Sequence, residues 1–285
     1  MVKPIYYFFG FVLVISFLFV LVSFIGALIK TKASEKKIHR LLTKYGGLKG
    51  NIIASIVGVI TPFCSCTTVP IFAGLIRTNV SLGVAMSFLI ASPTINIAAF
   101  IILLSLFGIK MAFYYVSACF IIAVSAGYIL GKIPLKKQIK PSFVNFQDCE
   151  IGSWKNSLSF SFKSLFYFLP ILILSAAIGA LIYNYVPSDF LLKLTLNNNP
   201  IIIPVVVLLG AIIYADIILL IPIGYALLLK GVNQGIVFAF MIAASGMSIP
   251  QILLLSKILK TRVIIYFILI LLVLYTLLGV AFYYI

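Results

Sequence analysis

Acidic residues and histidine are scarce in this 285-residue chain, with five Asp and Glu and a single His, and charged residues of every kind make up only 9 %. A soluble globular domain has roughly 25 % charged residues, so the composition excludes a soluble protein. So few acids and histidines also argue against metal-dependent or acid–base enzymes. The sequence has no phosphate-binding loop of the kind that ATP-driven transport uses. We therefore expect neither an enzyme nor a cofactor.

Hydrophobic residues are abundant instead, at 64 % of the chain, with a mean hydropathy of +1.26. Apolar runs of about 20 residues recur along the sequence, and each is long enough to cross a bilayer core. This pattern indicates an all-α polytopic membrane protein surrounded by lipid. The net charge of +16 arises from basic residues between the apolar runs, where they set membrane orientation. We therefore expect no nucleic-acid partner.

The distribution of basic residues predicts the topology. Residues 5–29 form a first apolar run, too long for a signal peptide, so we expect a retained span. Seven Lys and Arg fall in residues 30–49, whereas only Lys3 precedes the span. The positive-inside rule then places the N-terminus outside and the following loop in the cytoplasm, with the plasma membrane as the expected location.

The chain also shows an internal repeat. A shift of 152 residues aligns the two halves without a gap, and 12 of the 46 positions from 58 to 103 are identical. The matches include Gly58 with Gly210, Pro70 with Pro222 and Gly83 with Gly235. We expect one membrane repeat over residues 1–131, a basic cytoplasmic linker over 132–156 and a second membrane repeat over 157–285.

Counting charges favours inverted repeats. If one interrupted stretch in each half is a re-entrant hairpin, the three most basic segments all become cytoplasmic, as positive-inside statistics require. The preferred hairpins are residues 52–76 and 202–228, which leaves two full spans and an interrupted helix to cross in each half. Inverted repeats with interrupted helices are the architecture of many secondary transporters.

Small polar residues interrupt the apolar stretches near their middles, and we expect these breaks to meet at the membrane midplane. Backbone that is not helical at this depth is tolerated only where protein or a water-lined cavity satisfies it. The alternative is that Pro62, Pro93 and Pro250 merely kink packed helices. The residues that we expect to bind substrate are Cys64, Ser65, Cys66, Thr67, Thr68, Ser92, Pro93, Thr94, Asn96, Ser245 and Ser248.

Two of the four cysteines stand one residue apart within a break. Cys64 and Cys66 offer soft sulfur ligands, which suit thiophilic species such as trivalent arsenic or Cu(I). The alternative is that both are small buried residues. Cys119 lies in an apolar span, where we expect it to pack, and Cys149 lies in the linker between two acids.

Asp216 is the only acid within an apolar stretch, and it occupies the repeat position of Cys64. An intramembrane carboxylate indicates function, and burial would raise its pKa toward the range that proton coupling needs. We therefore name Asp216 as the candidate proton-coupling residue. The alternative is a structural acid paired with Arg77, Lys230 or a serine.

The run Thr61-Pro62-Phe63-Cys64-Ser65-Cys66, with Val69-Pro70, Gly74-Leu75 and Ala91-Ser92-Pro93 before Asn96, resembles the predicted-permease family that contains the organoarsenical efflux permeases. The resemblance covers most of the chain. It implies a membrane permease, some of whose relatives export trivalent organoarsenicals such as methylarsenite. By the same match, Cys64 and Cys66 would be thiol ligands, and Ser92, Pro93 and Asn96 would line the site.

The leading hypothesis is thus an efflux permease that moves a small thiophilic solute by alternating access. We keep a homo-oligomer as an alternative to a single copy of the chain. A second hypothesis is a permease for an unrelated solute, in which the cysteines are structural. A third, of another class, is a membrane thiol-disulfide oxidoreductase. Such enzymes usually use a Cys-x-x-Cys pair near the surface and a second shuttle pair, whereas Cys64 and Cys66 are expected at the midplane.

Overall fold

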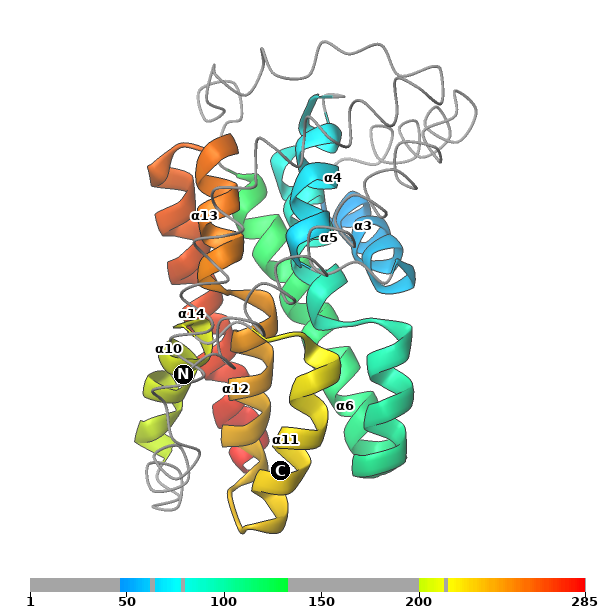
Figure 1. Cartoon of the computed structure of the whole chain (residues 1–285). Coiled ribbons are helices and arrows are strands. Elements are labelled where there is room, and N and C mark those ends of the chain that lie inside the picture. The colour runs from blue at the N-terminus through cyan, green and yellow to red at the C-terminus, as the bar shows by residue number, and fades with distance from the viewer. Residues whose placement is uncertain (1–46, 62–64, 78–79, 133–199, 213–214, 285) are drawn as a thin grey trace, which may run out of the picture.

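A computed structural model of the chain describes residues 47–61, 65–77, 80–132, 200–212 and 215–284, in which every regular element is a helix (Figure 1). The expected all-α polytopic class is therefore confirmed. The helices are α3 (Leu48–Ile60), α4 (Ser65–Arg77), α5 (Leu82–Thr94), α6 (Ile97–Gly131), the 3-10 turn η3 (Pro200–Ile202), α10 (Ile203–Ile212), α11 (Ile217–Leu229), α12 (Gln234–Gly246), α13 (Ile249–Ile258) and α14 (Thr261–Tyr283). The expected first span lies outside the described residues, as does nearly all of the basic linker.

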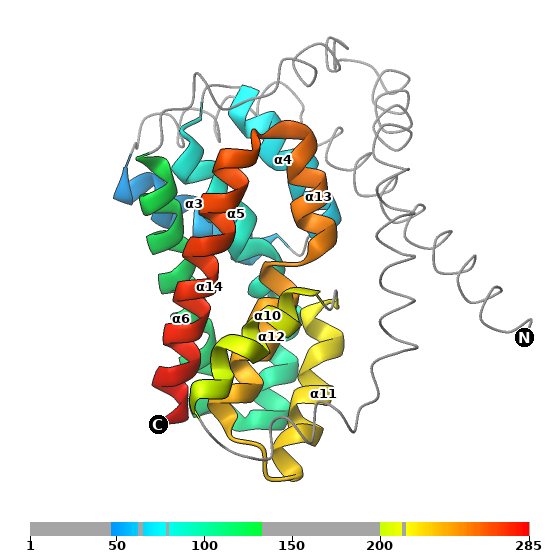
Figure 2. The same ribbon diagram turned by 90° about the vertical axis from the view of Figure 1, so that its left-hand side faces the viewer.

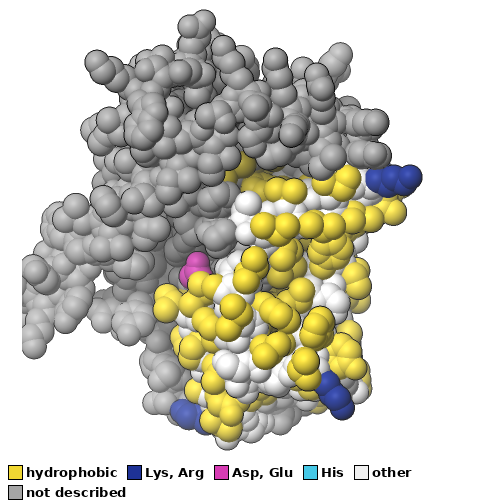
Figure 3. Space-filling model, turned by 90° about the vertical axis from the view of Figure 1, so that its right-hand side faces the viewer, with side chains coloured by type: hydrophobic (Ala, Val, Ile, Leu, Met, Phe, Trp, Pro, Cys, Tyr) yellow, Lys and Arg dark blue, Asp and Glu magenta, His cyan; other side chains and the backbone are white. Residues whose placement is uncertain are grey.

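Three stretches of helix are long and apolar enough to cross a membrane: Ile97–Gly131, Gln234–Ile258 and Thr261–Tyr283. Large hydrophobic side chains are exposed along them, among them Ile101, Ile121 and Leu277 at 61–65 %. Figure 3 shows such side chains over most of the described part of one face, with basic groups at the upper and lower edges of that part. A surface of this kind is stable against lipid, which makes this a membrane protein.

Helix α6 reverses direction at Gly108, which adopts φ 80° and ψ 168° inside it. This backbone region is open essentially only to glycine. As a result, residues 97–107 and 109–131 lie beside each other in Figure 1, coloured turquoise to green. The chain thus passes from the first part of α6 directly into a long span that runs the other way.

Helix bounds recur in the second half of the chain at the spacing of the sequence repeat. The ends of α11, Ile217 and Leu229, are the repeat counterparts of Ser65 and Arg77, the ends of α4, and α12 corresponds to α5 in the same way. Together η3 and α10 match α3, and the range from the start of α13 to the end of α14 matches that of α6. Gly108, where α6 turns, corresponds to Lys260, which separates α13 from α14.

The two sets of short helices lie at opposite ends of the molecule. Figures 1 and 2 both show α3, α4 and α5 in the upper part, and α10, α11 and α12 in the lower part. Each set also packs against a helix from the other half of the chain: α4 packs against α13, and α11 packs against α6. On the lower side the ring of Phe107 meets that of Tyr225, with centroids 5.6 Å apart. The two halves of the chain therefore form one interlocked core.

Glycines let the helices of each half cross closely. A Cβ atom on Gly83 of α5 would lie 2.5 Å from the carbonyl oxygen of Gly127 and 2.8 Å from Cα of Gly131 on α6. The corresponding Gly235 of α12 lies against Gly279 and Tyr283 of α14 in the same way. Small residues at such crossings allow close backbone packing, which is a main source of helix association in membranes.

Candidate functional site

The first break separates α5 from α6. Helix α5 ends at Thr94, whose hydroxyl donates to the carbonyl oxygen of Ile90 at 2.7 Å, and the following Ile95 is extended. Asn96 then starts α6: its side-chain oxygen accepts a hydrogen bond from Ala99 N at 2.6 Å. Because Pro93 lies in the last turn before an extended residue, the chain here ends one helix and begins another. The simple proline kink is thus excluded at this position.

The second break separates α12 from α13 in the corresponding place. Helix α12 ends at Gly246, Met247 is not helical (φ −139°, ψ 54°), and Ser248 precedes the first turn of α13. Pro250 stands in that first turn, a position in which its missing N–H costs nothing. Ser245 is buried in the last turn of α12. This proline also marks a helix start rather than a kink.

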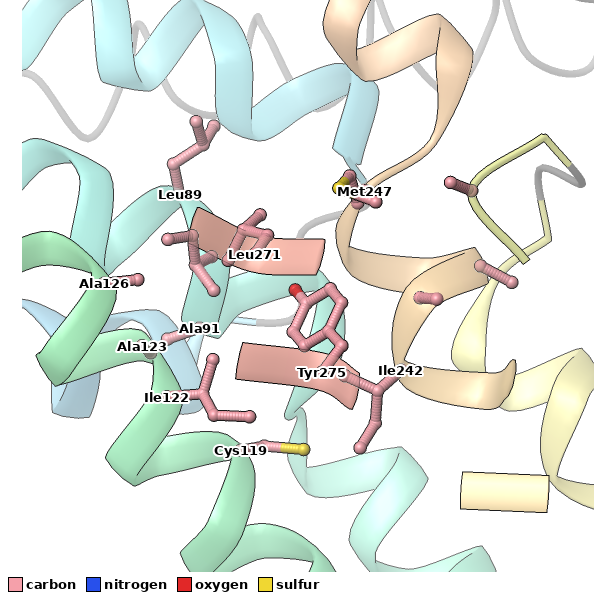
Figure 4. Packing of buried hydrophobic residues seen from close by; sticks show 14 of the residues in the cluster. Leu89, Ala91, Cys119, Ile122, Ala123, Ala126, Ile242, Met247, Leu271 and Tyr275 are labelled. Atoms are coloured by element: carbon pink, nitrogen blue, oxygen red, sulfur yellow. The ribbon is translucent and has the colours of Figure 1, made fainter. Parts of the chain in front are cut away.

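The two breaks meet in the interior. A Cβ atom built on Gly246 would lie 2.6 Å from Cγ2 of Thr94 and would also clash with the hydroxyl of Tyr275, on α14. Figure 4 shows Tyr275 between Cys119 of α6 and Met247 at the second break. Thr94 is 1 % exposed and Tyr275 is fully buried. The ends of α5 and α12 and the side chain of Tyr275 therefore lie together in the protein interior.

The end of α3 joins the first break. The hydroxyl of Ser92 donates to the carbonyl oxygen of Thr61 at 3.1 Å, and the hydroxyl of Thr61 donates to the Val57 carbonyl oxygen at 2.8 Å. Gly58 allows this approach, because a Cβ there would lie 3.0 Å from that of Ala91. The structure thereby brings the start of the expected Thr-Pro-Phe-Cys-Ser-Cys segment beside the expected Ser92.

The thiol pair follows directly. Cys64 lies outside the described residues, and Ser65, Cys66 and Thr67 open helix α4, although their side chains are not described. Thr68, one residue further along, is completely buried. Of the expected site residues, Thr68, Ser92, Pro93, Thr94, Asn96, Ser245 and Ser248 are all buried, and Cys119 is buried as the expected packing residue.

Asp216 starts helix α11. Its carboxylate accepts a hydrogen bond from Ile218 N at 3.0 Å, and the side chain is half-buried. Figure 3 shows one acidic group among hydrophobic side chains on the molecular face, and Asp216 is the only acid of the described ranges. Lys230 follows the last residue of the same 13-residue helix. At 1.5 Å per residue, its backbone lies about 20 Å from that of Asp216. Lys230 is therefore excluded as the ionic partner of Asp216.

The buried polar side chains of the described interior are uncharged. Ten polar side chains are buried in the described part of the chain, and all of them are Ser, Thr, Asn or Gln. Within those same residues no cluster of three or more His, Cys, Asp or Glu has the arrangement of a metal site. The centre therefore offers hydroxyl and amide groups together with helix ends, which carry partial charges.

Two residues of this centre were not predicted from the sequence. Gln251, in the first turn of α13, is fully buried, as is Tyr275. Neither the Gln251 amide nor the Tyr275 hydroxyl has a hydrogen-bond partner among the residues described. A signal for Gln251 existed: the Ser-x-x-Gln spacing from Ser248 is that of a helix capping box. Tyr275 lies in an uninterrupted apolar span and has no such signal.

Comparison with known proteins gives a consistent result. Residues 2–284 match a family described as predicted permease. The UPF0718 protein MJ0584 of Methanocaldococcus jannaschii is 22 % identical, over 75 % of this chain and 76 % of its own length. A Streptococcus mutans protein, named as a subunit of a two-component membrane permease complex, is 26 % identical over 76 % of this chain and 74 % of its own. No solved structure matches.

Proposed function

The chain belongs to this predicted-permease family, and from that premise we propose that it exports a small thiophilic solute, such as a trivalent organoarsenical, with Cys64 and Cys66 as the sulfur ligands. The membrane permease itself follows from the family and the apolar helices. The solute, the thiol site, the direction of transport and the coupling ion are the proposal.

The observation that most supports it is the contact between the two breaks. Thr94 ends α5 and Gly246 ends α12, and the two lie against each other in the buried centre. A solute held there is reached from either side when the two halves of the chain rock about this contact, as in alternating access. Inverted repeats fit this motion, and the recurrence of the helix bounds at the repeat spacing supports such repeats.

The cysteines stand next to this centre in the chain. Cys64 and Cys66 flank Ser65, the first residue of α4, and Thr61, just before this segment, accepts the hydrogen bond from Ser92. A dihydroxy organoarsenical exchanges its two hydroxyl groups for the sulfurs of two thiols, and each thiol proton leaves with one hydroxyl group as a water molecule. Binding of this kind is strong enough to select a soft solute and is reversible by the same exchange.

Orientation follows from where the basic residues lie. Figures 1 and 2 show the end of α6 and the junction of α13 with α14 in the upper part of the molecule. Lys132 follows α6, Lys260 precedes α14 and Arg262 lies in its first turn. The turn of α6 and the end of α11 lie in the lower part, and Lys110 and Lys230 follow them. The excess of basic residues supports a cytoplasmic upper end in the plasma membrane, with hairpins α3–α4 and α10–α11 re-entering from opposite sides.

Asp216 is proposed as the proton-coupling residue. It is the only acid among the described residues, it starts α11, and it is neither fully buried nor fully exposed, as a group that exchanges protons with water must be. Partners other than lipid and solute are proposed from one relative, which is named as a subunit of a two-component permease complex: a second subunit or a second copy of this chain.

The test is uptake of methylarsenite, arsenite and Cu(I) into everted membrane vesicles. The native chain is compared at equal expression with the double variant Cys64→Ser, Cys66→Ser. We expect one of the three to accumulate, and the double variant to reduce its uptake at least tenfold. Cys119→Ala is the matched control, because it removes a buried thiol from the continuous span of α6 and should leave uptake unchanged.

Two results would overturn the proposal. If none of the three solutes is moved, the protein is a permease for another solute. If the double variant transports as well as the native chain, Cys64 and Cys66 are structural. A disulfide between them that forms with an added disulfide oxidant and is removed by a dithiol reductant, detected by mass spectrometry, would favour the oxidoreductase instead.

A further inference from the structure

The first turn of α13 has the residues of a capping box but lacks the hydrogen bonds of one. In a capping box, Ser at the helix start bonds the backbone N–H three residues later, and Gln at that later position bonds back. Ser248 and Gln251 have this spacing, yet the Ser248 side chain makes no capping hydrogen bond. The Ser248 hydroxyl and both polar atoms of the Gln251 amide are without partners in the described structure.

At the corresponding position in the first half of the chain, the capping hydrogen bond is formed. Asn96 is the repeat counterpart of Ser248 and Ala99 that of Gln251, and there the Asn96 oxygen accepts a hydrogen bond from Ala99 N at 2.6 Å. Helix α11, whose start also lies at a break, is capped by Asp216. Among these three helix starts, only that of α13 leaves its capping groups unused.

Leaving such groups unpaired in the interior is expensive. Ser248 and Gln251 are 0 % exposed, and a buried polar group without a hydrogen-bond partner loses its hydration without compensation. Two residues before Ser248, Gly246 lies against the Tyr275 hydroxyl, which is also without a partner within the described residues. Several unpaired donors and acceptors thus gather near one helix start, which itself presents free N–H groups.

We infer that Ser248, Gln251 and Tyr275 form a subsite for an uncharged, hydroxyl-bearing solute at the start of α13. A hydroxyl group both donates and accepts, and it is matched by the amide of Gln251 and the two hydroxyls. An ion is disfavoured, because none of the ten buried polar side chains in the described ranges is charged. The inference rests on the permease function proposed above, and it selects the neutral hydrated form of the solute over Cu(I) or an oxyanion.

The subsite would also serve the proposed thiol exchange. Helix α13 packs against α4, which Ser65 opens, so both helices of this pair begin beside a break. An arsenical that arrives with its hydroxyl groups bound at α13 would present the arsenic atom toward the other helix. The hydroxyls released by exchange leave as water.

The test uses thiol labelling, which is independent of transport. In full-length protein with all four native cysteines replaced, Ser248→Cys and Gln251→Cys are each treated in membranes with a small water-soluble methanethiosulfonate. Leu255→Cys is the control, since Leu255 is equally buried one turn further along α13. We expect positions 248 and 251 to react at least tenfold faster than position 255, because a binding site on a transport path is reached by water.

Protection from labelling then tests the class of solute. Boric acid, uncharged and trihydroxylated, should slow modification at positions 248 and 251 several-fold, whereas inorganic phosphate should not. Equal reactivity at all three positions would overturn the subsite, and so would protection by phosphate alone or by neither solute. Failure of the thiol proposal appears only in the uptake assay, so the two outcomes are distinguishable.

A stability measurement excludes a purely structural role. Gln251→Leu removes unpaired groups and keeps the side-chain size, so we expect a Tm no lower than that of the native protein in detergent. The same variant should reduce uptake at least tenfold. A large fall in Tm with uptake preserved would show that Gln251 supports the fold, and would contradict the inference.

Discussion

Thr94 at the end of α5 lies directly against Gly246 at the end of α12. The two residues come from different halves of the chain, and each ends a helix that stops inside the protein. Only a glycine fits here, because a Cβ at position 246 would meet both Cγ2 of Thr94 and the hydroxyl of Tyr275. Any motion of one half relative to the other changes this contact, together with the packing of α11 on α6 and of α13 on α4.

A methyl group added at position 246 should therefore destabilise the protein, and the size of the effect should depend on the Tyr275 hydroxyl. We expect Gly246→Ala to lower the free energy of unfolding by about 1–3 kcal/mol and to reduce uptake. Adding Tyr275→Phe removes the hydroxyl that the new methyl group meets, so the double variant should regain part of the lost Tm. A double-mutant cycle of Tm values in detergent measures the coupling; strictly additive effects would contradict the contact.

Asp216 has a structural role that can be separated from its proposed role in coupling. Asn starts helices as well as Asp does, so Asp216→Asn should keep the hydrogen bond from Ile218 N and the native Tm. Asp216→Ala should cost about 1 kcal/mol of stability. If the carboxylate couples transport to protons, Asp216→Asn vesicles will no longer respond to an imposed pH gradient. An unchanged response would leave Asp216 as a helix cap only.

The glycine crossings should be intolerant of any side chain. At Gly83 the clashing atoms belong to the backbone of α6, which cannot turn aside, so Gly83→Ala should cost about 1–3 kcal/mol. Ser81→Ala is the matched control, because Ser81 is exposed and its side chain makes no capping bond. Tm in detergent and the fraction of monodisperse protein are measured; equal values for both variants would contradict the close crossing of α5 and α6.

Much of the fold follows from local features of the sequence. The apolar runs predict helices. Pro93 and Pro250, with their small polar neighbours, predict where these helices are interrupted, because proline does not fit the interior of a helix. The family match confirms the resemblance based on the Cys-Ser-Cys segment. The preferred hairpin at 52–76 agrees with the bounds of α3 and α4, although the placement of both hairpins in a membrane is still a prediction.

Other features depend on contacts between distant segments, which no local pattern encodes. Nothing near Tyr275 in the sequence indicates that its hydroxyl meets Gly246. The packing of α4 against α13 joins segments from opposite halves of the chain. Gly108 looks like any glycine in an apolar run, and only its positive φ reveals that α6 turns there. The helix-end residues of the candidate site could thus be named from the sequence, whereas Tyr275, which a continuous span brings there, could not.

The most direct test of the account is transport by the purified chain alone. The protein is reconstituted into liposomes, and counterflow of labelled methylarsenite is followed with the native chain, with Cys64→Ser, Cys66→Ser and with Gln251→Leu. The account predicts counterflow with the native chain and at least a tenfold loss in both variants. Counterflow no faster than in protein-free liposomes would contradict the account, as would counterflow that both variants preserve.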